Sequence, residues 1–401
     1  MRSLPQPLKR RPRWGHRVTL FQLRQPAFWF YLGFLTLAGL LTLVQQETFL
    51  AMAPVGWLLS WFLLALYAVP VFLLIYFLDL YEKEPLSLVF GAFLWGAVVA
   101  TALAAIANFG WGLVVQGVGG AGFASRWTPA LTAPFVEETL KGAGVVMIYL
   151  IARREVDDMM DGFVYGAMVG LGFTIVEDVF YFVARFGGSP LAVLIGFFIR
   201  VIASGLYGHI LWTGLTGMGV GYFVSRVGEA SRAKRLAVAA ALFLTAVAGH
   251  FLWNSPLLDF FPRGVTSGGD LLRGVWAAAV KGLPLLGVVA GMVILARRRE
   301  HRWLRTALAT ELGHEGILES EMDALATPAT RRRARREMAT RAGPGAAGLL
   351  ARLQKEQINL AMVASRVGDE AHPDLANQRR YCRALREAVA VSLSPPRPPP
   401  G

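Results

Sequence analysis

Three ionisable side chains lie in the middle of an apolar run that spans about residues 128–151. The run is long enough to cross a bilayer as a helix, yet it contains Glu137, Glu138 and Lys141. Charge at that depth costs roughly a few kcal/mol per residue, so such groups usually face a protein interior or a wet cavity and often serve a function. The sequence therefore predicts a membrane protein built around two carboxylates.

The composition excludes an ordinary soluble domain of this size. Of the 401 residues, 55% are hydrophobic and 17% are charged, and the mean hydropathy is +0.47. The net charge of +13 lies at the N-terminus, in short loops and in the C-terminal tail, which favours an anionic membrane surface over a specific nucleic acid. The single cysteine, Cys382, excludes an internal disulfide and a thiolate metal cluster.

The apolar runs predict an all-α fold, a polytopic membrane bundle of about eight transmembrane helices. They cover about residues 27–44, 55–78, 86–115, 128–151, 161–186, 202–224, 236–253 and 275–296. The stretch 190–224 exceeds one span and contains Arg200, so a short re-entrant or interfacial helix should precede the sixth span near Ile202. The spacing of Gly162, Gly166 and Gly170 predicts that a neighbouring helix packs closely there.

Charge divides the chain into three regions. Residues 1–26 carry basic side chains without an acid, residues 27–296 hold the spans, and residues 297–401 predict a helical cytoplasmic tail with a proline-rich disordered end. Starting from a cytoplasmic N-terminus, the eight spans place the arginine-rich loops inside. The loops near residues 45–54, 117–127, 187–189 and 254–274 then lie outside and hold few basic residues. We expect a multi-pass plasma-membrane protein with both termini in the cytoplasm.

Further polar side chains lie inside the spans or at their ends: Glu177 with Asp178, His209, and His250 with Asn254. At about 1.5 Å per residue, Glu137 and Glu177 each lie roughly 14 Å below the outer ends of their spans. With the same rise per residue, His209 lies roughly 10 Å and His250 about 6 Å from the outer ends of their own spans. These depths allow one shared cavity in the outer half of the membrane.

Helical spacing separates the roles of the paired carboxylates. Glu137 and Lys141 are one turn apart and can pair, whereas Glu138 is rotated by about 100° from Glu137. One carboxylate can therefore face a reacting centre while a partner helix holds the other, and Lys141 is expected to be an ion-pair partner.

The residue types fit hydrolysis of a peptide bond. In the first interpretation Glu137 is a general base that activates water, and no metal or other cofactor is required. Glu138 assists or orients Glu137, and Glu177 and His209 position water or a ligand. His250 and Asn254 stabilise the oxyanion.

Taken together and in order, the motifs resemble the PrsW family of intramembrane proteases. They are Glu137-Glu138-x-x-Lys141, Phe173-x-x-x-Glu177, Gly208-His209-x-x-Trp212, His250-x-x-x-Asn254 and the loop Asp79-x-Tyr81-Glu82-Lys83-Glu84-Pro85. The resemblance covers about residues 79–254 and implies a plasma-membrane peptidase, distantly related to the CAAX prenyl endopeptidases of the Abi family. We expect the transmembrane peptidase domain to span residues 27–296. The resemblance also implies a membrane-anchored substrate, such as an anti-sigma factor, cut on its extracytoplasmic side. Members of this family are often described as metalloproteases.

Three alternatives remain. The same peptidase could hold a divalent metal such as zinc through Glu137, Glu138, Glu177, His209 and His250. Buried acids with lysine and histidine also occur in proton- or cation-coupled transporters, although no inverted repeat is found. The chain could instead be a scaffold that acts through its tail, where the basic cluster Arg331–Arg336 is either a solvated helix face or a contact with anionic lipid.

Overall fold

A computed structural model describes residues 19–78, 83–203, 208–257, 268–314, 316–367 and 372–393 of the chain. Over these residues the structure is helical, and the described part contains no strand beyond one isolated bridge between Leu312 and Ile317. The chain divides into two compact units, one formed by Arg17–Val293 and the other containing Ile294–Gly401. The predicted all-α fold is confirmed.

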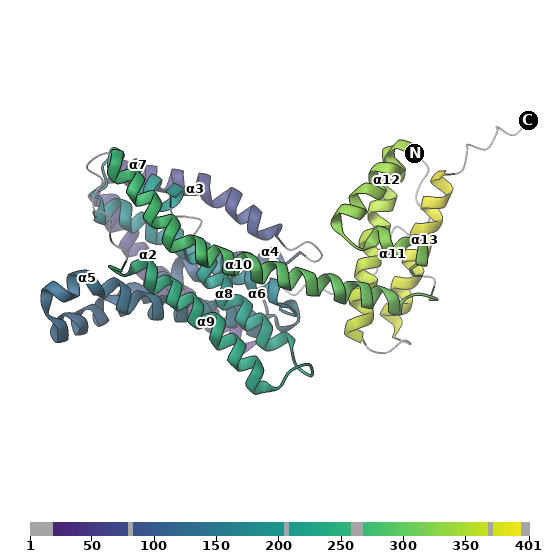
Figure 1. Cartoon of the computed structure of the whole chain (residues 1–401), viewed down its shortest axis with the longest axis horizontal. Coiled ribbons are helices and arrows are strands. Elements are labelled where there is room, and N and C mark those ends of the chain that lie inside the picture. Colours follow the sequence, from purple (N-terminus) through teal and green to yellow (C-terminus); the bar gives the residue numbers. More distant parts are fainter. Residues whose placement is uncertain are drawn as a thin grey trace, which may run out of the picture. The chain divides into compact units, whose positions relative to one another are not determined.

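The first unit is a bundle of helices, several of them long (Figure 1). Six stretches of the described residues are long and apolar enough to cross a membrane, and the longest is the 66-residue stretch Leu86–Ile151. The polytopic membrane fold is therefore confirmed. In chain order the helices are α2 (Pro26–Met52), α3 (Pro54–Tyr76), α4 (Leu86–Leu94), η1 (Trp95–Ala100), α5 (Thr101–Ile151), η2 (Arg153–Glu155), α6 (Met159–Phe180), η3 (Tyr181–Arg185), α7 (Pro190–Phe197), η4 (Phe198–Ala203), α8 (His209–Ser225), α9 (Arg232–Asn254) and the first part of α10 (Gly268–Thr310).

Two predicted boundaries differ from the structure. The predicted loop 117–127 is helical except at Gly120, whose φ of 77° breaks α5 into two helices. Glycine adopts a positive φ without a Cβ clash, so a single residue suffices to redirect the chain between the third and fourth predicted spans. The sixth span begins at His209 and not near Ile202, because Gly208 precedes α8 in a non-helical conformation. The predicted short helix is present as Pro190–Ala203 and carries Arg200.

Helix α6 lies at the centre of this unit and packs against α8, α4, η1, α5 and α3. Its glycine stripe meets the backbone of α8 directly. A Cβ atom at Gly162 would lie 2.2 Å from the carbonyl oxygen of Gly217, and one at Gly166 would lie 2.2 Å from that of Thr213. Glycine is needed at both positions, and the predicted close packing is confirmed. This approach places the polar residues of α6 beside the start of α8.

Side-chain contacts fix the start of α6. The Asp158 carboxylate accepts from the backbone N–H of Asp161 at 3.0 Å, and the Asp161 carboxylate accepts from the N–H of Asp158 at 2.8 Å, which forms a capping box. One turn further along, the Tyr165 hydroxyl donates to Glu84, which belongs to the motif after α3. The first part of that motif, residues 79–82, lies outside the described residues.

The second unit contains the end of α10, α11 (Glu319–Leu325), α12 (Pro328–Val367, broken at Gly343) and α13 (Pro373–Leu393). Helix α12 packs on α13 and α11. The predicted helical tail is thus present, while its proline-rich end lies outside the described residues. Cys382 is fully buried, and burial raises the pKa of its thiol, which makes it a poor nucleophile.

The basic cluster of this unit has two kinds of member. Arg331 is buried and donates to the carbonyl oxygen of Leu325 at 2.9 Å, so it serves the packing of α11 on α12. Arg332, Arg333 and Arg336 are exposed. A contact of these three side chains with anionic lipid stays a prediction.

Candidate active site

Four helices bring polar residues to one cavity inside the first unit. Helix α5 contributes Glu137, α6 contributes Glu177, α8 begins with His209, and α9 contributes His250 and Asn254. All five line a cavity of about 480 Å³. Residues that the sequence placed at similar depths therefore share one cavity.

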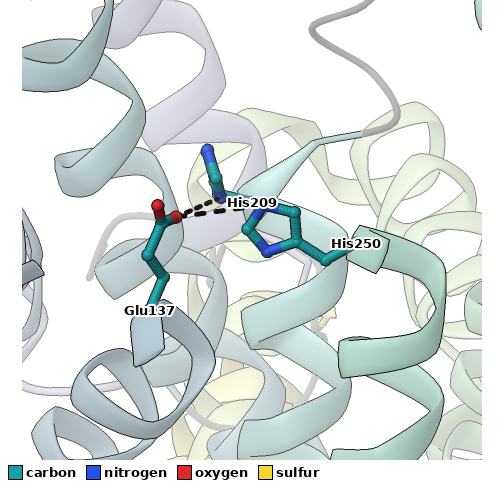
Figure 2. Close-up of side chains that lie close together, drawn as sticks. All are labelled: Glu137, His209 and His250. Atoms are coloured by element: carbon teal, nitrogen blue, oxygen red, sulfur yellow. Dashed lines mark ion pairs between the residues drawn. The ribbon is translucent and has the colours of Figure 1, made fainter. Parts of the chain in front are cut away.

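The two carboxylate oxygens of Glu137 have different surroundings. Oε1 accepts a hydrogen bond from Asn108 Nδ2 at 3.1 Å. Oε2 is buried and accepts no hydrogen bond from the part of the chain that the structure describes. It lies 3.9 Å from His209 Nδ1 and 3.9 Å from His250 Nε2. Dashed lines mark these two pairs in Figure 2. One oxygen is thus fixed by an amide, and the other faces two imidazole rings.

Glu138 and Lys141 lie beside this centre, and both are fully buried. Lys141 Nζ is 2.6 Å from Glu138 Oε1 and 3.6 Å from Glu137 Oε2. Glu138 Oε2 accepts from the Thr213 hydroxyl of α8 at 3.1 Å. Lys141 therefore pairs with both glutamates and is closer to Glu138. Partner helices hold Glu138, while Glu137 faces the cavity.

The contacts of His250 define which ring nitrogen is free. Its Nδ1 is 3.2 Å from Glu138 Oε1. An ionised carboxylate only accepts hydrogen bonds, so Nδ1 carries a hydrogen, and in the neutral ring Nε2 keeps a lone pair that faces Glu137. The ring stacks on Trp212, with centroids 4.0 Å apart and planes 12° apart. In this arrangement Nε2 accepts rather than donates, which does not favour the predicted role of His250 as an oxyanion donor.

His209 is held from both sides. Its Nδ1 is 2.7 Å from Lys141 Nζ, and its Nε2 is 3.1 Å from Glu177 Oε2. An ammonium group only donates, so Nδ1 is the acceptor and Nε2 donates to Glu177. Glu177 therefore orients the imidazole of His209.

Arg200 of η4 extends this network away from the cavity centre. Its Nη2 donates to Glu177 Oε2 at 2.7 Å, and its Nε donates to Asp178. The guanidinium lies 3.6 Å from the centroid of the Tyr181 ring. Arg200 thus connects the short helix to Glu177 and, through Glu177, to His209.

The remaining predicted residue, Asn254, lines the cavity, and its amide donates to the carbonyl oxygen of Pro129 at 3.2 Å. Sequence reasoning missed Asn108 and Thr213, which bind Glu137 and Glu138. A lone amide at Asn108 within an apolar run was a usable signal. The hydroxyl of Thr213 carried none, because threonine is common in membrane helices.

The residues at the centre fit a divalent metal ion. Glu137, His209 and His250 each offer one ligand atom, and these atoms lie within 4.8 Å of one another. One carboxylate with two imidazoles is the donor set of many hydrolytic zinc sites. Glu137 Oε2 is a buried acceptor without a hydrogen bond from the described residues, and a cation would satisfy it. Glu138 and Glu177 instead bind the other ring nitrogen of His250 and His209, respectively. Carboxylates commonly hold metal-bound histidines in this way without contacting the metal.

Residues 84–283 match the family described as PrsW family intramembrane metalloprotease. Over 110 residues the chain is 34% identical to Protease PrsW of Bacillus subtilis, which covers 27% of this chain and 47% of that protein. It is also 34% identical over 110 residues to Protease PrsW of Geobacillus kaustophilus, covering 46% of that protein. The chain thus aligns with about half the length of these relatives. No solved structure matches it significantly.

Proposed function

Since this chain belongs, through residues 84–283, to the PrsW family, we propose that it is an intramembrane endopeptidase that hydrolyses peptide bonds of membrane-anchored proteins. The observation that carries the proposal is the buried Glu137 Oε2, which accepts no hydrogen bond from the described residues and faces two imidazole nitrogens in a cavity. A carboxylate oxygen that accepts no hydrogen bond can take a proton, and the cavity has room for a peptide segment.

The proposed reaction needs only water and the peptide bond. Glu137 Oε2 takes a proton from water as the water oxygen bonds to the carbonyl carbon. When the C–N bond breaks, Glu137 returns that proton to the leaving amine, which restores the carboxylate. Asn108 holds the second oxygen of Glu137, so the base keeps its direction. Glu138 and Glu177 keep the two imidazole rings in fixed orientations.

A metal-dependent version of the same peptidase is the second candidate. The lone pair at His250 Nε2 favours it, because a neutral nitrogen with a free lone pair binds a cation and does not donate to an oxyanion. Glu137, His209 and His250 would hold the ion. When bound there, a zinc ion would polarise the carbonyl group and favour ionisation of its water.

The proposal also covers the substrate and the cellular location of the protein. We expect a membrane-anchored substrate of the anti-sigma-factor kind, cut near the extracytoplasmic face. We also expect a plasma-membrane location with both termini in the cytoplasm, because the arginine clusters then lie inside.

Cleavage in cells tests the proposed activity. A panel of tagged single-span membrane proteins from the same organism, including anti-sigma factors, would be produced with the wild type or with the double variant His209→Ala/His250→Ala. We expect at least one member to be cut by the wild type and to stay intact with the double variant, because both imidazoles of the centre are lost.

The matched control is His372→Ala, which removes a half-exposed imidazole of the second unit. This variant should cut as the wild type does. Equal cleavage by the wild type and a stably produced double variant would contradict the assignment of the centre, and a panel that stays intact with every protein would contradict the proposed activity.

Chelation separates the two candidates. For the protein purified in detergent, the metal-dependent version predicts that exhaustive treatment with 1,10-phenanthroline lowers the cleavage rate at least a hundredfold and that added Zn²⁺ restores it, whereas the version with Glu137 alone predicts an unchanged rate. The non-chelating isomer 1,7-phenanthroline is the control. Unchanged cleavage by protein shown by elemental analysis to be metal-free would leave Glu137 as the base acting alone.

A further inference from the structure

Lys141 is a buried ionisable group of the centre that has no role in the proposed reaction. Its side chain is wholly inaccessible, and an ammonium group at this depth needs several partners. It has Glu138 Oε1 at 2.6 Å, His209 Nδ1 at 2.7 Å and the Phe173 ring centroid at 4.3 Å. Glu137 Oε2 follows at 3.6 Å.

These contacts place a positive charge against the atoms that a metal ion would use. Of the three candidate ligands, His209 offers its lone pair at Nδ1, and Lys141 already donates to that atom. His250 differs, since its Nε2 faces Glu137 Oε2 and its other nitrogen is bound to Glu138. The two imidazoles are therefore unequal: one lone pair is open and the other is bound by an ammonium group.

We propose that Lys141 competes with a divalent metal ion for His209. When no metal is bound, the Lys141 ammonium group holds Glu138 and His209 together. This inference rests on the proposed ligand set of Glu137, His209 and His250. An ion can reach all three ligands only if the contact between Lys141 and His209 breaks. The displaced ammonium group stays near the metal ion, because it remains paired with Glu138. The two positive charges then repel each other strongly, since the surroundings have a low dielectric constant.

The distances from Lys141 support the same conclusion. Lys141 Nζ lies 2.7 Å from His209 Nδ1 and 3.6 Å from Glu137 Oε2, so its positive charge opposes a cation held by those two atoms. Removing the ammonium group should therefore strengthen metal binding, although Lys141 is not a ligand.

Metal titration of the purified full-length protein tests the proposal without any substrate. Metal-free wild type and Lys141→Met in detergent would be titrated with Co²⁺ and followed by visible absorption, with Zn²⁺ competition as a check. Methionine keeps the unbranched shape and removes the charge. We expect Lys141→Met to bind Co²⁺ at least tenfold more tightly than the wild type. Adding His209→Ala to Lys141→Met should abolish that gain.

Two further variants keep the test decisive. Lys234→Met removes an exposed lysine at the start of α9 and should leave Co²⁺ affinity unchanged. If Lys141→Met does not fold because Glu138 loses its partner, Glu138→Gln/Lys141→Met is compared with Glu138→Gln alone, and the loss of the ammonium group should again tighten Co²⁺ binding at least tenfold. Equal or weaker binding by the folded Lys141 variants would overturn the proposal, and so would a gain that persists without His209. Cleavage by the wild type is measured separately, so a failure here leaves the proposed activity untouched.

Discussion

Replacing Glu137 by glutamine should lower the cleavage rate at least a hundredfold while the protein stays folded. Glutamine keeps the shape of the side chain and an oxygen that can accept from Asn108. Its amide nitrogen cannot take a proton from water and cannot bind a metal ion, so both versions of the mechanism lose their central oxygen. General-base catalysis typically contributes a factor of about 10² to 10⁴. Initial rates on a substrate found in the cell panel would measure the loss.

Glu47→Gln is the matched control for this substitution. Glu47 is an exposed glutamate of α2, so its change to glutamine should leave the rate unaltered. Gel filtration and the midpoint of detergent-induced unfolding would establish that both variants are folded. A Glu137→Gln variant that cuts within threefold of the wild-type rate would show that this carboxylate is not the base.

The helical bundle and its central packing could be predicted from the sequence because both depend on local patterns. A run of apolar residues sets the length of each helix, and glycines four residues apart leave one face smooth, as Gly162 and Gly166 do against α8. The difference between Glu137 and Glu138 was also foreseeable, since neighbouring residues on a helix point about 100° apart.

Other features could not be predicted because they arise only when helices meet. Lys141 reaches Glu138 more closely than Glu137, although the spacing of four residues favoured Glu137. The hydrogen positions on His209 and His250 follow from which partner each nitrogen meets on another helix. A sequence pattern contains no such information.

Arg200 is another residue whose partners could not be predicted from the sequence. The sequence marked it as an obstacle to a single long span, and that interpretation located the short helix Pro190–Ala203 correctly. Its partners, Glu177 and Asp178, lie more than twenty residues earlier on α6. Only the packed structure links Arg200 to the imidazole of His209.

Replacing Arg200 by methionine should lower the free energy of unfolding by about 3 kcal/mol, because breaking a buried ion pair leaves an uncompensated charge. Here two carboxylates lose a cationic partner: Glu177, whose side chain is 18% exposed and which keeps its contact with His209, and Asp178, whose side chain is 1% exposed. The stacking on Tyr181 is lost as well. The measurement is the shift in the midpoint of unfolding by sodium dodecyl sulfate in mixed micelles.

A rescue variant distinguishes lost charge pairing from lost packing. Arg200→Met combined with Glu177→Gln and Asp178→Asn removes all three charges and should regain most of the lost stability, since a buried ion pair contributes little net stability over neutral groups of similar shape. Arg185→Met is the control, because Arg185 lines the same cavity but is exposed, with its guanidinium 5.8 Å from the Phe180 ring centroid. Its effect should stay below about 0.5 kcal/mol. If the triple variant were as unstable as Arg200→Met alone, packing of the guanidinium, and not charge, would hold the short helix to α6.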